Sequence, residues 1–79
     1  MWEIENGTVL EIPAGAKALH VGWQNKRLNL WAQVDPEVPK LKRRVAVVPT
    51  GGEVPDGWEF AGTALAPRDR AFHVYIEIV

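Results

Sequence analysis

The residue types that perform most enzyme chemistry are scarce in this chain of 79 residues. Cysteine and serine are absent, and the threonines lie in no recognisable nucleophile motif. The two histidines, His20 and His73, are far apart and form neither a His-x-His nor a His-Glu-x-x-His pattern. We therefore expect a protein that is not an enzyme and holds no metal or cofactor. The alternative enzyme hypothesis is a phosphodiesterase in which His20 or His73 acts as general acid or base.

Trp31 is the leading candidate for recognition chemistry. It is a large aromatic residue in a segment whose other outward positions are polar, and pairing across Asn25-Lys26 places it opposite His20. Two interpretations stay open. Trp31 lies in a subunit interface, where tryptophan is enriched, or it is a stacking platform for a base or another planar group. In the second case His20, Arg27 or Asn29 would hydrogen-bond around the ligand.

The run Lys40–Arg44 is the one local concentration of positive charge. It is either a solvated loop leading into the next strand or a phosphate-binding segment, because the forked guanidinium of Arg43 or Arg44 matches a phosphate group. Nine Lys and Arg against ten Asp and Glu give a net charge of −1, so no bulk attraction to long nucleic acid is expected. A small anionic nucleotide needs only a few local cations and is compatible with this charge.

Short strands are expected to position these side chains, because glycine and proline interrupt the chain too often for a long helix. No apolar run approaches the ~18 residues of a membrane span, so no membrane partner is expected. The expected strands are Trp2–Glu5, Thr8–Ile12, Lys17–Gln24, Arg27–Val34, Arg43–Pro49, Trp58–Ala66 and Phe72–Val79. They predict a single all-β domain over residues 1–79, a small antiparallel sandwich or partly open barrel of about six strands.

The size of the domain also bears on its assembly. A domain this short buries only about 60% of its unfolded surface, and no disulfide can stabilise it. Four Trp, two Phe and one Tyr supply large buried areas. Self-association is the remaining source of stability, so we expect a homo-oligomer.

The hairpin centred on Asn25-Lys26 has the clearest pattern. A two-residue loop there pairs Gln24 with Arg27 and continues to the pair Leu19–Ala32. A shift of one residue would exchange the two faces, so their clean segregation supports this register. The opposite face is polar apart from Trp31. The face assigned to the core carries Leu19, Val21, Trp23, Leu28, Leu30, Ala32 and Val34.

The last predicted strand alternates in the same way. If Trp58–Ala66 pairs with it across the loop Pro67–Arg70, Tyr75 lies opposite Gly62 and covers it. His73 and Tyr75 share one face of this strand and join the candidate ligand or interface residues. The other face carries Phe72, Val74, Ile76 and Ile78.

A series of short motifs runs in a fixed order along the chain, and in this order it resembles an uncharacterised family of short phage-encoded proteins. The most specific block is Leu28–Pro36, which reads Leu-x-Leu-Trp-Ala-x-Val-Asp-Pro. The chain departs from the family at Lys26, where Gly is frequent, and at Tyr75, where Phe is usual. The other matching motifs are Ile12–Lys17, Leu19-x-Val21, Gln24-Asn25, Thr50-Gly51, Phe60-x-Gly62-Thr63 and His73-Val74.

The resemblance implies a viral protein that acts in the cytoplasm of an infected bacterium. Several unrelated small phage proteins are oligomers that sequester the nucleotide signals of bacterial immune systems. By analogy, the leading hypothesis is a non-enzymatic homo-oligomer that sequesters such a nucleotide. The alternative is a protein–protein interaction module that blocks a host defence protein through a flat apolar patch.

We expect Leu30→Ala to destabilise the domain by about 2–5 kcal/mol, because it truncates a residue of the assigned core. Trp31→Ala should leave the fold intact and reduce either oligomerisation or ligand binding. Urea denaturation of both variants checks this. A Trp31→Ala variant that unfolds as readily as Leu30→Ala would refute the hairpin register.

Overall fold

The computed structural model describes residues 1–78, which are built from strands and turns. The predicted range of the third strand is confirmed, and most of the others differ from prediction by one or two residues at an end. Val79, the predicted end of the last strand, lies outside the described residues. The strands are β1 (Trp2–Glu3), β2 (Val9–Pro13), β3 (Lys17–Gln24), β4 (Arg27–Gln33), β5 (Lys40–Pro49), β6 (Glu59–Ala66) and β7 (Arg70–Ile76).

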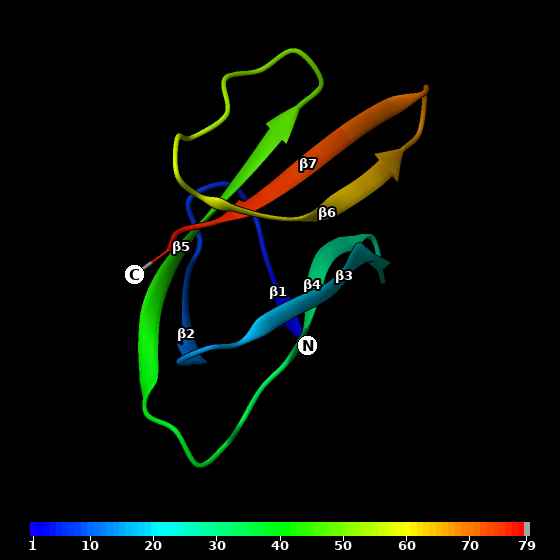
Figure 1. The fold of residues 1–79 in the computed structure, drawn as a ribbon. Helices are drawn as coiled ribbons and strands as arrows, with labels where there is room; N and C mark the ends of the chain where they lie inside the picture. The colour runs from blue at the N-terminus through cyan, green and yellow to red at the C-terminus, as the bar shows by residue number, and fades with distance from the viewer. Residues whose placement is uncertain (79) are drawn as a thin grey trace.

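The strands form two antiparallel sheets that pack as a sandwich and do not close into a barrel (Figure 1). The smaller sheet has the order β1-β4-β3 and the larger one the order β2-β5-β7-β6. The predicted fold class is therefore confirmed. Each of the seven expected ranges overlaps one strand within residues 1–78, which makes one strand more than the overall expectation of about six. The N-terminal segment explains the number, because it turns after Glu5 and enters both sheets: β1 pairs with β4, and β2 pairs with β5.

The β3–β4 hairpin has the predicted register from its turn to the pair His20–Trp31. Asn25 and Lys26 have φ values of 53° and 64°, the left-handed pair required by a two-residue hairpin turn of type I′. Asparagine adopts this conformation readily, whereas a lysine there costs about 1 kcal/mol. The turn therefore forms as the sequence indicated, with backbone strain at Lys26.

A bulge in β3 corrects part of the predicted core face. Ala18, not Leu19, lies opposite Ala32, because one extra residue is inserted into β3 between Ala18 and His20. Leu19 is consequently 60% exposed instead of buried. Trp23 and Val34 were also assigned to the core, and both are exposed because they lie at the two ends of the hairpin.

The core between the sheets is aliphatic. Leu30 is fully buried at its centre, which agrees with the assignment of this residue to the core. Every Trp, Phe and Tyr keeps some exposure, so the aromatic residues surround the core instead of filling it. The core residues are Ile4, Leu10, Ile12, Ala16, Val21, Leu28, Leu30, Val45, Ala64, Val74 and Ile76.

The basic run belongs to a strand, so its interpretation as a solvated loop is wrong. β5 begins at Lys40 and pairs with β2 along its basic half, with Leu41 opposite Ile12 and Arg43 opposite Leu10. Neighbouring side chains of this strand point to opposite faces. Arg43 is therefore buried with the core, whereas the side chain of Arg44 is exposed.

The edges of the two sheets meet where β6 approaches β3. Gly62 has a φ of 152°, and a Cβ atom built on it would lie 2.8 Å from Cγ2 of Val21. A bulge between Phe60 and Gly62 shifts the pairing with β7 by one residue. The predicted cover of Gly62 by Tyr75 is wrong because the β6–β7 turn pairs Ala66 with Arg70, which puts Gly62 opposite Val74. Beyond the bulge Tyr75 lies opposite Phe60, with ring centroids 5.4 Å apart.

We expect Gly62→Ala to destabilise the domain by about 1–3 kcal/mol beyond the backbone cost of a positive φ, because the added methyl group forces β6 away from Val21. Gly57→Ala is the matched control, since Gly57 also has a positive φ of 76° and a Cβ there meets nothing within 4 Å. Urea denaturation measures both. Equal losses of stability would show that β6 and β3 can separate without cost.

Candidate functional site

Two partly exposed aromatic residues meet where the β3–β4 and β6–β7 turns lie at the same end of the sandwich (Figure 1). The rings of Trp23 and Phe72 pack edge to face, with centroids 6.4 Å apart and planes at 79°. The indole Nε1–H of Trp23 donates to the carbonyl oxygen of Leu65 at 2.6 Å, which ties β3 to β6. Trp23 is still 45% exposed, so part of its ring is available to a partner.

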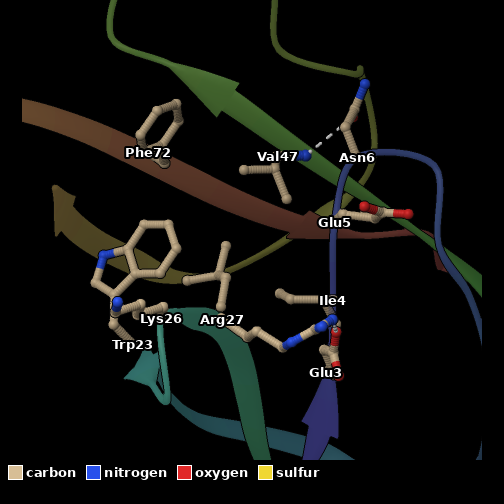
Figure 2. Close-up of a pocket in the computed structure, with 10 residues that line it drawn as sticks. Glu3, Ile4, Glu5, Asn6, Trp23, Lys26, Arg27, Val47 and Phe72 are labelled. Atoms are coloured by element: carbon tan, nitrogen blue, oxygen red, sulfur yellow. Dashed lines mark hydrogen bonds and ion pairs between the residues drawn. The ribbon is translucent and has the colours of Figure 1, made fainter.

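Two adjoining hollows flank this aromatic pair, and together we name them the end hollow. The first has a volume of about 590 Å³. The second has a volume of about 400 Å³ and shares Trp23, Lys26 and Phe72 with the first (Figure 2). Both volumes lie in the range of small-molecule sites, about 300–1,000 Å³. The first hollow is completed by Ala66, Pro67 and Arg70, and the second by Glu3, Ile4, Glu5, Asn6, Arg27, Leu28 and Val47.

Cations border the end hollow unevenly. The first hollow carries Lys26 and Arg70, and the described part of the chain contributes no carboxylate to its lining. The guanidinium carbon of Arg70 lies 5.9 Å from the Phe72 ring centroid, and its Nε–H donates to the carbonyl of Pro67 at 3.3 Å. In the second hollow Arg27 forms an ion pair with Glu3, and the hydrogen bond that Arg27 donates to this carboxylate raises the pKa of Arg27. The first hollow therefore suits an anion better.

Trp31 and His20 form a contact on the outer face of the smaller sheet. Their ring centroids are 5.3 Å apart and their planes are tilted by 42°. His20 lies over Gly22, where a Cβ would come within 2.8 Å of its Nε2 atom. Arg27 starts the neighbouring strand and lines the end hollow. Asn29 is buried and its amide nitrogen donates to the Arg27 carbonyl at 2.9 Å, so it does not face a ligand on Trp31.

The two predicted phosphate-binding arginines contact carboxylates of this chain. Nη2 of Arg43 lies 3.1 Å from a carboxylate oxygen of Glu59. Arg44 donates from Nε at 3.1 Å and from Nη2 at 2.7 Å to the Glu77 carboxylate, and lies 5.6 Å from the Trp58 ring centroid. The backbone N–H of Arg44 also donates to this carboxylate, at 3.3 Å. The side-chain bonds and the backbone bond together lower the pKa of Glu77.

His73 and Tyr75 lie on the outer face of the larger sheet. Nδ1 of His73 lies 2.9 Å from the hydroxyl oxygen of Thr63, and its Nε2 lies 3.2 Å from that of Thr50. Tyr75 packs against Phe60, as described above. The structure therefore distributes the residues singled out from the sequence over several surfaces instead of one site.

The aromatic and cationic residues of the end hollow were missed from the sequence, apart from Arg27. Trp23 was assigned to the core from its alternation, which gives the correct face but not the distance to the end of the sheet. A signal was present: Trp23 comes just before the Asn25-Lys26 turn, and Phe72 follows Arg70 just after the β6–β7 turn. Aromatic residues beside two turns lie at an open end if both turns share that end.

Two other features are absent from residues 1–78. No group of three or more His, Cys, Asp or Glu side chains is placed to hold a metal ion. Within the same residues, no helix has the length and apolar character needed to cross a membrane.

The chain belongs to the DUF7352 family, a domain of unknown function, whose family model matches residues 2–79. The expectation of an uncharacterised family is thus confirmed. Searches of curated proteins and of solved structures gave no match.

The Arg44–Glu77 pair predicts a pH dependence of stability. Because the pKa of Glu77 is lower in the folded than in the unfolded state, its stabilising contribution is present above the unfolded pKa. This contribution is lost as the pH falls through the folded-state pKa. Urea denaturation across the acid range should show a smaller loss of stability for Glu77→Gln than for the wild type. Glu53→Gln, in the exposed loop after β5, is the control and should lose stability with falling pH as the wild type does. A Glu77→Gln variant with the same pH dependence of stability as the wild type would contradict the prediction.

Proposed function

We propose that this protein is a non-enzymatic binding protein that holds a small, planar, anionic ligand of the nucleotide type in the end hollow. The observation that carries the proposal is the combination of an exposed Trp23 ring with two cations, Lys26 and Arg70, around one hollow. Aromatic faces stack on bases regardless of their sequence, and cations neutralise phosphate. The remaining wall is apolar and supplies the dry contact area that such ligands bury.

Different residues of the hollow would make different contacts with the ligand. The Trp23 ring is held by its hydrogen bond to Leu65, so stacking on it costs little ordering. Arg70 is placed beside Phe72 by its bond to Pro67, and Lys26 is held at the rim by the strained turn. The phosphate of a ligand stacked on Trp23 would lie between these two cations.

Binding without turnover is supported by the lining residues. Among the residues that the structure describes, this lining includes neither a histidine nor a hydroxyl side chain that could act as a nucleophile. His20 and His73, the residues of the phosphodiesterase hypothesis, lie on the outer faces of the two sheets.

The biological setting is part of the same proposal. The resemblance to phage-encoded proteins suggests a viral protein in the cytoplasm of an infected bacterium, where a nucleotide signal of host immunity would be the sequestered ligand. Sequestration requires only binding, and a homo-oligomer would multiply the number of sites. The small aliphatic core supports self-association as a source of stability.

A second candidate function rests on a different surface. The outer face of the larger sheet exposes Phe60 and Leu65 and carries the half-buried Trp58 and Tyr75. A flat face with several aromatic residues suits a protein partner. This supports the alternative of an interaction module that blocks a host protein.

The test is isothermal titration with ADP-ribose and cyclic di-AMP, combined with quenching of tryptophan fluorescence. We expect one of these nucleotides to bind and Lys26→Gly to weaken its binding about tenfold, because a phosphate contact is lost. The same substitution should raise stability by about 1 kcal/mol, because glycine relieves the positive φ. A variant that binds the nucleotide more weakly while its free energy of unfolding rises has lost a ligand contact and has no folding defect.

Tryptophan variants locate the ligand. Trp23→Leu should abolish quenching, whereas Trp31→Leu should retain it. Loss of binding in Trp31→Leu alone would transfer the site to the His20–Trp31 face. If neither nucleotide binds and Phe60→Asp releases a host protein captured by the wild type, the interaction module replaces the nucleotide-binding function.

A further inference from the structure

A third hollow lies at the other end of β3 and β6 and contains a buried arginine. Its volume is about 490 Å³, and we name it the Arg43 hollow. Arg43 is only 7% exposed. A buried guanidinium is costly unless it is paired, so a buried arginine on the wall of a hollow calls for a physical account.

Arg43 is held rigidly by two contacts of its own chain. Its Nε–H donates to the carbonyl oxygen of Glu77 at 2.7 Å, and its Nη2 lies 3.1 Å from the Glu59 carboxylate. A guanidinium has five N–H donors, and these two bonds use only part of them. The side chain is therefore oriented in advance, with donor capacity left for another acceptor.

The charge around the Arg43 hollow favours a monoanion. Lys17 and Arg43 contribute positive charges and Glu59 a negative one, so the lining residues within 1–78 leave one positive charge in excess. The rest of the wall is mostly apolar, including the exposed side chains of Leu41 and Ile78. A dianionic phosphate would lose more hydration here than a single excess charge returns.

We infer that the Arg43 hollow binds a carboxylate that carries a short branched apolar group. The carboxylate accepts from the free donors of Arg43, because guanidinium and carboxylate match in shape and charge. The apolar group covers Leu41 and Ile78, which are otherwise left in water. This site is separate from the end hollow and does not depend on nucleotide binding.

The ligand and Glu59 both accept hydrogen bonds from the Arg43 guanidinium, so they compete for the same positive charge. Replacing Glu59 by glutamine removes the negative charge that competes with the ligand and keeps a side chain of the same size. If Arg43 serves only to hold the fold, the same substitution leaves affinity for any carboxylate unchanged.

The experiment follows the Arg43 Nε–H resonance by two-dimensional nitrogen–proton NMR while isovalerate is added to the whole protein. We expect a saturable shift with an affinity in the millimolar range, as such a small ligand allows. Isovaleramide, which has the same shape without the charge, should give no saturable shift. Inorganic phosphate should bind more weakly than isovalerate.

Variants complete the test. Glu59→Gln should tighten isovalerate binding about threefold to tenfold, and Lys17→Gln should weaken it about threefold. Lys42→Gln, at an exposed position of β5 that does not line the hollow, is the matched control and should bind isovalerate as the wild type does. The same spectra report whether each variant is folded.

Four outcomes would overturn the inference. They are the absence of a saturable shift, an equal shift with isovaleramide, phosphate binding as tight as isovalerate binding, and a Glu59→Gln variant whose affinity is unchanged or lower.

Discussion

The close approach of β6 to β3 at Gly62 is the constraint on which the rest of the structure depends. It joins the edges of the two sheets on one side, where a methyl group would already collide with Val21. β3 and β6 also contribute residues to both candidate binding sites, one at each end of these strands. At one end the junction brings the indole of Trp23 to the carbonyl of Leu65, and at the other Glu59 begins β6 beside Arg43. Both hollows exist because the sheets are held together between them.

The sequence allowed the fold class and the central hairpin to be predicted, because alternation and the Asn25-Lys26 turn are local signals. The bulges near Leu19 and Gly62 were not predictable, since a bulge adds one residue without changing residue types in a distinctive way. Each bulge shifted every pairing beyond it. This is why Leu19 left the core face. Tyr75 came to lie opposite Phe60 because the bulge adds to a register that the β6–β7 turn, which pairs Ala66 with Arg70, had already shifted by one residue.

The candidate site was harder to predict than the fold, because it depends on where each sheet ends. Trp23 lies on the core-facing side of β3, but it is so close to the turn that its side chain is not covered. It lines the end hollow instead. Arg43 shows the reverse case. A basic run suggested a solvated segment, yet alternation in β5 directs one of its arginines inward. Alternation alone placed Trp23 in the core and residue type alone suggested a solvated position for Arg43, and both residues lie in the opposite environment.

The contacts of Glu77 affect how this small domain unfolds locally. Its carbonyl accepts from the inward Arg43, its carboxylate accepts from the outward Arg44, and its N–H donates to the Arg44 carbonyl at 2.9 Å. A segment that follows the last residue of a strand normally frays early, but Glu77 is held against both faces of β5. Peeling it away would break contacts on both faces at once. Slow amide exchange near the C-terminus would then report global unfolding, while proteolytic nicking would begin in the exposed loop after β5.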